Sequence, residues 1–348
     1  MSTPDLTHPD VPEEFRAFVV SDDFDRYGLR PGEPTASPRY LQVELTDLCN
    51  LACAGCVRSE HDSVGAVLDI ATFTNTIDQL PDLEHVSFVG AGEALIVRNF
   101  ATYVQACTDR GVFSSTNTNG LLVRRRLEAA LDAGLGLLAI SVDGADDTTL
   151  GVMRSGLRTS RLSASLTAAV ALIEHRDARL SAAVTLSSTN IETFADIVSF
   201  VAEHGLTEIT VESLHHWGTD KSLNAQSLFA LDAAYVTGHI EAGLARALEL
   251  GLKLSVFDYS RLDDPAAANA VCPWPWDASY VTKDADVTPC CVNMEAEPHN
   301  LLGNVAETPI REIWWSDRYV KLRDSFVEGP TWNSCDQCVY RMEFGRVR

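Results

Sequence analysis

Short apolar runs alternate with amphipathic stretches through the first two thirds of the chain. The apolar runs are rich in β-branched residues and predict strands at 41–46, 85–89, 112–118, 137–142, 180–186 and 208–213. The amphipathic stretches predict helices at 70–80, 97–110, 122–133, 160–175 and 191–204. Six strand–helix repeats predict an α/β fold whose parallel sheet has helices on one face, and right-handed crossovers would curl that sheet into a partial (β/α)6, TIM-like barrel.

The segments outside these repeats predict three regions. Residues 1–38 are polar and proline-rich, and we expect an N-terminal extension that wraps the barrel. A long helix at 226–250 and a strand at 252–258 complete a barrel region that spans 39–262. The remaining residues, 263–348, form a small C-terminal domain in this interpretation.

Composition limits the functions that the chain can have. Its 348 residues carry 27 basic and 49 acidic side chains, a net charge of −22, which disfavours nucleic acid as a substrate. The charge would suit a cationic small molecule such as an amino sugar, although an acidic surface that keeps the protein soluble is the favoured explanation. Basic residues cluster at Arg124, Arg125 and Arg126 and in the tail at Arg341, Arg346 and Arg348, and these are candidate docking points for an acidic electron donor or ordinary surface.

The cysteines and the N-terminus together predict a cytoplasmic protein. The first fifteen residues have neither the basic segment nor the apolar segment of an export signal. No apolar run approaches the ~20 residues that cross a bilayer. Nine cysteines in such a chain indicate a reducing compartment and metal ligation, not disulfides. We therefore expect no membrane partner.

Three cysteines follow the first predicted strand with the spacing C-x3-C-x2-C: Cys49, Cys53 and Cys56. Full ligation of a cube of four irons takes four thiolates, so this set leaves one iron with an open position for a substrate or cofactor. The alternative is a structural zinc site completed by His61, but such sites usually consist of two paired C-x2-C units.

Polar residues also follow the later strands, at the end of the sheet where parallel α/β folds bind ligands. Gly92 would let the backbone approach a ligand closely, and Glu93 can accept a hydrogen bond from an ammonium group. Ser141 and Asp143 alternate with apolar residues and so point to one side. The other candidates are Asn119, Arg154, Glu212, His215 and His216. The alternatives are a plain Asn-Gly turn at Asn119, a surface role for Arg154 and structural roles for the histidines.

The cysteine spacing resembles the signature of the radical S-adenosylmethionine (SAM) superfamily, and the motifs after it are similar to that family's too. The resemblance implies that a 4Fe–4S cluster on Cys49, Cys53 and Cys56 binds SAM. It also implies that Gly92 and Glu93, in the sequence Gly-Ala-Gly-Glu-Ala, hold the SAM amino group. Asn119, Ser141, Asp143 and Arg154 would then contact the rest of SAM. The chain departs from the family at Ala91, Ala94 and Gly55.

The C-terminal region resembles the auxiliary-cluster module called SPASM, in its shorter form, twitch. The resemblance implies a second 4Fe–4S cluster on Cys272, Cys290, Cys335 and Cys338, with Cys291 as the ambiguous neighbour; a four-cysteine zinc site is the alternative. Cys107, in the second predicted helix, is expected to be a buried core thiol.

The resemblance implies a radical dehydrogenase similar to enzymes of the 2-deoxy-scyllo-inosamine dehydrogenase type. Such an enzyme would oxidise a secondary alcohol of an aminocyclitol or sugar in natural-product biosynthesis, with Glu212, His215 or His216 as base and the second cluster as electron acceptor. The donor would be a flavodoxin or ferredoxin. Two alternatives are modification of a peptide or protein and redox-neutral epimerisation of a sugar with Cys291 or Cys107 as hydrogen donor.

Overall fold

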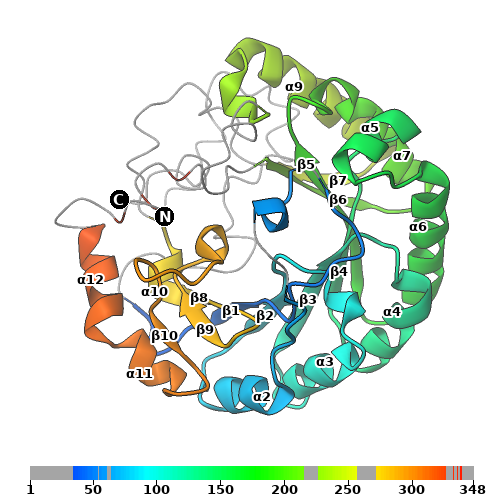
Figure 1. Ribbon diagram of the computed structural model, residues 1–348. Helices are drawn as coiled ribbons and strands as arrows, with labels where there is room; N and C mark the ends of the chain where they lie inside the picture. Colours follow the sequence, from blue (N-terminus) through cyan, green and yellow to red (C-terminus); the bar gives the residue numbers. More distant parts are fainter. Residues whose placement is uncertain are drawn as a thin grey trace.

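The strands of the protein form one sheet of ten in the order β10-β9-β8-β1-β2-β3-β4-β5-β6-β7 (Figure 1). The computed structural model describes residues 34–53, 55–60, 64–214, 226–256 and 272–326, together with residues 332, 335 and 338. The strands are β1 (Tyr40–Val43), β2 (His85–Phe88), β3 (Phe113–Thr118), β4 (Leu137–Ser141), β5 (Arg179–Leu186), β6 (Glu208–Ser213), β7 (Lys253–Val256), β8 (Ala278–Val281), β9 (Asp286–Thr288) and β10 (Gly303–Asn304). Strands β1 to β7 are parallel to their neighbours, as the sequence predicts.

Helices cover the convex side of this curved sheet (Figure 1). They are α2 (Ile70–Asp78), α3 (Phe100–Thr108), α4 (Val123–Asp132), α5 (Asp147–Met153), α6 (Thr159–Ile173), α7 (Phe194–Glu203) and α9 (Ala233–Leu250). The predicted partial barrel is therefore confirmed. Three details differ from the prediction. Helix α5 lies between β4 and α6, in a stretch where no helix was predicted. Strand β7 extends the parallel sheet beyond six strands, and the helix expected from residue 226 begins at Ala233, because the Asp232 side chain caps it by accepting from Tyr235 N.

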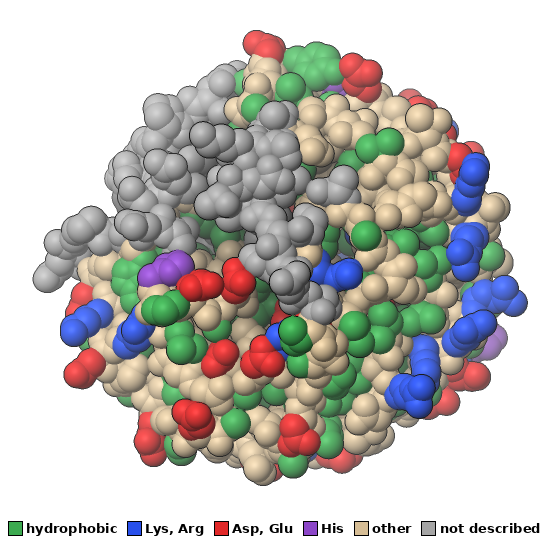
Figure 2. Space-filling view, viewed as in Figure 1, with side chains coloured by type: hydrophobic (Ala, Val, Ile, Leu, Met, Phe, Trp, Pro, Cys, Tyr) green, Lys and Arg blue, Asp and Glu red, His purple; other side chains and the backbone are tan. Residues whose placement is uncertain are grey.

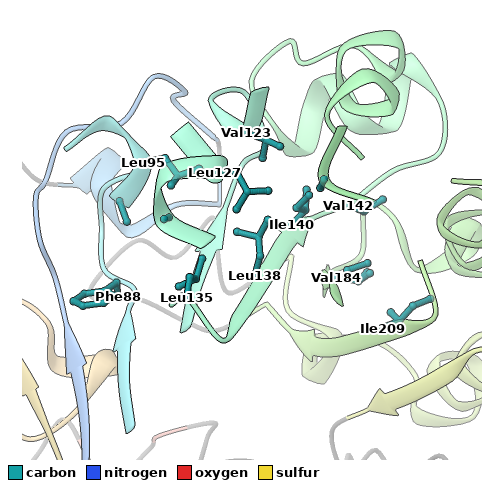
Figure 3. Close-up of a cluster of buried hydrophobic side chains, with 14 of the residues drawn as sticks. Phe88, Leu95, Val123, Leu127, Leu135, Leu138, Ile140, Val142, Val184 and Ile209 are labelled. Carbon is teal, nitrogen blue, oxygen red and sulfur yellow. The ribbon is translucent and has the colours of Figure 1, made fainter. Parts of the chain in front are cut away.

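Side chains along each strand point alternately to the two faces of the sheet, and those on one face pack against the helices. Leu138 and Ile140 of β4 are fully buried and point toward Val123 and Leu127 of α4 (Figure 3). Since neighbouring residues of a strand face opposite sides, Ser141 faces the inner side of the sheet. Packing of the apolar face thus orients the polar residues toward the interior of the curve.

The C-terminal region is built onto the first strand of the barrel. Strand β8 pairs in parallel with β1, from Tyr40 opposite Ala278 to Val43 opposite Val281. Strands β9 and β10 follow antiparallel, which confirms the hairpin-like segment. Helices α10 (Trp274–Asp277), α11 (Ile310–Trp314) and α12 (Asp317–Ser325) pack beside them. Among the described residues, no helix has the length and apolar character that a bilayer crossing requires.

Candidate active site

A cavity of about 360 Å³ opens at the carboxyl ends of the parallel strands. Its lining includes ten of the residues singled out in the sequence: Cys49, Cys53, Cys56, Gly92, Glu93, Asn119, Ser141, Asp143, Arg154 and Glu212. They come from five different strands or the loops that follow them and from the end of α5, so only the fold brings them together. His215 and His216 lie outside the described residues. The volume falls in the range of small-molecule sites.

The loop that carries the first three cysteines is fixed by contacts with the next two strands. Glu93 N donates to Leu48 O at 2.8 Å, just before Cys49. The Asn119 side-chain amide donates to the Asn50 side chain at 2.7 Å and lies 3.7 Å from the Cys49 sulfur. Asn119 therefore does more than form the Asn-Gly turn, because its amide supplies a hydrogen-bond donor to a candidate ligand sulfur.

Glu93 is buried, and the protein itself uses most of its hydrogen-bonding capacity. Its carboxylate accepts from the Thr118 hydroxyl at 2.7 Å, from Asn119 N at 2.8 Å and from Leu95 N at 3.3 Å. A carboxylate has about four acceptor positions, so about one is left for a ligand such as an ammonium group. Burial raises the pKa of Glu93, although these hydrogen bonds act in the opposite direction.

Arg154 and Asp143 form an ion pair at the edge of the cavity. The other carboxylate oxygen of Asp143 accepts from Thr185 N at 2.7 Å, which anchors the pair to β5. Burial by itself would lower the pKa of Arg154, but Asp143 and the thiol of Cys53 raise it above its usual range. Arg154 is therefore a permanent cation beside Cys53.

The surroundings of the first three cysteines fit an iron–sulfur cluster. Burial raises the pKa of the Cys49 and Cys53 thiols, whereas Arg58 near Cys49 and Arg154 near Cys53 act to lower it. These cations and the Asn119 amide favour thiolates, which are the form that iron binds. Among the residues that the structure describes, no three His, Cys, Asp or Glu side chains are grouped as they would be around a single metal ion.

The four C-terminal cysteines assigned from the sequence are near enough to interact electrostatically. Burial raises the pKa of Cys272 well above its ordinary value, and the neighbouring thiols of Cys290, Cys338 and Cys335 raise it further. Cys291 is buried in a cluster with Tyr280 and lines the cavity. Of the two adjacent cysteines, Cys291 lines the cavity and Cys290 does not.

Glu44 and Tyr280 connect the barrel to the C-terminal domain. The Glu44 carboxylate accepts from Ala91 N at 2.8 Å and from the Tyr280 hydroxyl at 3.3 Å. Both side chains are buried, and burial raises the pKa of each. This contact was not predicted from the sequence: the lone Glu in the apolar run Leu-Gln-Val-Glu-Leu marks Glu44 as unusual but does not identify its partner.

Arg58 and Met294 are two other lining residues that sequence reasoning missed. Arg58 donates to Leu51 O at 3.0 Å, within the loop of the first three cysteines, and its buried Nε has no partner among the described residues. Met294 follows the C-terminal pair of adjacent cysteines, so the cavity extends into the C-terminal domain. Of the other cysteines, Cys107 is fully buried in α3, as predicted.

Two family models match the chain. The radical SAM superfamily matches residues 43–201, and the iron–sulfur cluster-binding domain called SPASM matches residues 272–339. Among curated proteins, the chain is 21% identical to a tungsten-containing aldehyde ferredoxin oxidoreductase cofactor-modifying protein of Pyrococcus furiosus, over 87% of this chain and 88% of that protein. It is 24% identical to an AdoMet-dependent heme synthase of Methanosarcina barkeri, over 83% and 86%. It is 26% identical to a GTP 3′,8-cyclase of Mycobacterium sp., over 83% and 86%.

Solved structures share the fold. SuiB of Streptococcus suis, bound to S-adenosylmethionine, superposes with a TM-score of 0.68 at 13% identity, over 92% of this chain and 74% of that one. The protein anSMEcpe with bound AdoMet superposes with a TM-score of 0.63 at 17% identity, over 88% of both chains. These likenesses extend across both the barrel and the C-terminal domain.

Proposed function

The chain is a radical SAM enzyme with a C-terminal SPASM domain, and from this we propose that it dehydrogenates a secondary alcohol of an aminocyclitol or sugar in natural-product biosynthesis. One observation carries the proposal. The cavity is lined both by the first three cysteines and by Cys291 and Met294 of the C-terminal domain. A substrate held there would lie between the two cysteine sets, as a net two-electron oxidation requires.

The cofactors of the enzyme are 4Fe–4S clusters and SAM. We assign one cluster to Cys49, Cys53 and Cys56, and a second to Cys272, Cys290, Cys335 and Cys338. When bound, SAM and the first cluster supply a carbon radical that takes one hydrogen atom from the substrate, and the second cluster supplies an acceptor for the electron left behind. SAM would contact Gly92, Glu93, Asn119, Ser141, Asp143 and Arg154, which all line the cavity.

Residues of the chain prepare the reaction by holding charges in place. Arg154, fixed by Asp143, sets a cation beside Cys53 and has the planar fork that suits a carboxylate. Glu212 lies in β6 with its side chain lining the cavity, and in this proposal its carboxylate oxygen takes the proton of the substrate hydroxyl. A reduced flavodoxin or ferredoxin supplies the single electron that starts each turnover.

The relatives support a small substrate. Their names refer to a cofactor-modifying protein, a heme synthase and a GTP cyclase, and each covers more than four fifths of this chain. The cavity volume of about 360 Å³ is at the lower end for ligand sites. A net charge of −22 favours a cationic amino sugar or aminocyclitol over an anionic substrate.

Epimerisation is the second candidate, because Cys291 places a thiol in the cavity wall. Here the thiol would return a hydrogen atom to the opposite face of the substrate carbon, and the sulfur radical would need one electron and one proton from the donor system. Cys107 is excluded from that role, since it is fully buried in the helix layer. Incorporation of solvent deuterium into the product would show epimerisation.

The test is anaerobic reconstitution followed by incubation with SAM, dithionite and a panel of aminocyclitols, sugars and peptides. A product lighter by two hydrogens supports the proposal. We expect Cys53→Ala to abolish methionine formation, because the first cluster loses a ligand. Cys335→Ala and Glu212→Gln should instead retain SAM cleavage and lose the oxidised product. Full product yield from Cys335→Ala would contradict the electron-acceptor role, and a modified peptide would replace the proposed substrate class.

A further inference from the structure

Four arginines form a basic edge on this otherwise acidic molecule: Arg98, Arg124, Arg125 and Arg126. The first three are exposed, and the Arg126 guanidinium donates to Arg98 O at 3.4 Å, which joins the two segments. Figure 2 shows Lys and Arg side chains gathered along the edge of the molecule where Figure 1 places α4 and α6.

Unlike Arg158 and Arg176 nearby, the basic edge has no acidic partner among the residues that the structure describes. Arg158 pairs with Asp147 at 3.0 Å, and Arg176 pairs with Asp132 at 2.9 Å. Within the described part of the chain, none of the four arginines of the basic edge forms an ion pair. Their charge is therefore available to a partner in solution.

The basic edge follows closely in sequence on residues of the candidate site. The Asn119 side chain, whose amide contacts Cys49, accepts from Leu121 N at 3.0 Å. Helix α4 begins at Val123, two residues after Leu121. Arg124 is five residues from Asn119, so their Cα atoms are at most about 18 Å apart. Arg98 is likewise five residues beyond Glu93. Arg98 and the run that begins at Arg124 thus each follow a residue of the candidate site by five positions.

Electrostatics limit what can dock there. A net charge of −22 repels an acidic protein from most of the surface. A local basic patch would therefore attract such a protein to one place and fix the orientation in which it binds. We propose that the basic edge is the docking surface for an acidic electron-transfer protein, which is oxidised by one electron as the cluster assigned to Cys49, Cys53 and Cys56 is reduced by one. This inference rests on the proposed function.

The test compares two double variants with the same change in charge. In Arg124→Glu/Arg125→Glu the new carboxylates lie in the first turn of α4, where the helix dipole favours them. The matched control is Arg311→Glu/Lys321→Glu, on exposed positions of α11 and α12 in the C-terminal domain. Methionine formation from SAM is measured with reduced flavodoxin and, separately, with dithionite. Binding of oxidised flavodoxin is measured by calorimetry.

At low salt we expect the flavodoxin-driven rate and the affinity of the Arg124/Arg125 variant to fall about tenfold or more below those of the control. The dithionite-driven rate should be equal in both, because a small reductant needs no docking surface. Equal flavodoxin rates and affinities in the two variants would overturn the inference. Failure of the unaltered protein to cleave SAM with dithionite would instead contradict the proposed function, and calorimetry would still report on docking.

Discussion

Gly92 lies where the loop after β2 meets the backbone before Cys49. A Cβ atom at this position would be 2.1 Å from Thr46 O and 2.7 Å from Leu48 O. Both atoms belong to the backbone, so no side-chain rotation can relieve the contact. The close approach also allows Glu93 N to donate to Leu48 O at 2.8 Å. Gly92 therefore sets the position of the cysteine loop relative to Glu93.

We expect Gly92→Ala to destabilise the protein by about 1–3 kcal/mol, because the added methyl group must push the two loops apart. The same shift should reduce the iron content after reconstitution. Urea unfolding and iron analysis measure the two effects. Gly238→Ala is the matched control, since its Cβ atom would meet nothing within 4 Å on helix α9, and it should stabilise by about 0.5–1 kcal/mol. Equal behaviour of the two variants would contradict this role.

At the scale of elements, Glu44 is the point where three of them meet. It follows β1, accepts from the loop after β2 through Ala91 N, and accepts from β8 through Tyr280. Gly90 leaves space for it, because a Cβ there would lie 2.5 Å from the Glu44 Cβ. A single buried carboxyl group thus connects the candidate SAM site with the domain of the second cysteine set.

Glu44 should make stability depend on pH. Burial raises its pKa above the ordinary 4.5, so the folded protein holds this proton more tightly than the unfolded chain does. The corresponding stability is complete below the ordinary pKa and is lost as the pH rises through the folded-state pKa. We expect the free energy of unfolding to fall less steeply from about pH 5 upward in Glu44→Gln than in the unaltered protein.

Urea unfolding of the cluster-free protein at a series of pH values measures this difference. Glu93 contributes a slope of the same sign, since its pKa is also raised by burial, and it should remain in the Glu44→Gln variant. The exposed carboxyl groups of Asp78 and Asp146 have lowered pKa values, so their effects lie at pH values below this window. Identical slopes in both proteins would show that Glu44 is ionised in the folded state.

At the scale of the whole molecule, the two domains share one sheet. Strand β1 pairs with β2 on one side and with β8 on the other, so it belongs to both cores. Without β8, the backbone groups along one edge of β1 would be unpaired and open to association. The contact between Glu44 and Tyr280 adds a buried hydrogen bond across the same boundary. We infer that neither domain is stable without the other.

This continuity predicts that the two domains unfold together. Five of the six tryptophans lie in the C-terminal region, at 274, 276, 314, 315 and 332, and Trp217→Phe removes the sixth. In that variant tryptophan fluorescence reports on the C-terminal domain, whereas far-UV circular dichroism reports mainly on the barrel helices. We expect the two urea transitions to coincide. A separate, earlier fluorescence transition would show that the C-terminal domain unfolds independently.

The sequence by itself determined the order and type of the elements and the position of the first three cysteines after the first strand. These features depend on residues close together in the chain: the period of apolar positions and a cysteine spacing within eight residues. The same local signals placed Gly92, Glu93, Asn119, Ser141, Asp143 and Glu212 at strand ends, and parallel pairing then requires them to lie at one edge of the sheet.

Only the tertiary structure decided which of these residues contact each other. It paired Arg154 with Asp143, and it engaged the Glu93 carboxylate in hydrogen bonds with Thr118 and Asn119 at the end of β3. It brought Cys290 near the other C-terminal cysteines, whereas Cys291 lines the cavity. It also joined β8 to β1 and brought Tyr280 to Glu44, across more than two hundred residues. Such contacts depend on how two distant segments pack and carry no periodic signal in either one, so no local pattern in the chain could have predicted them.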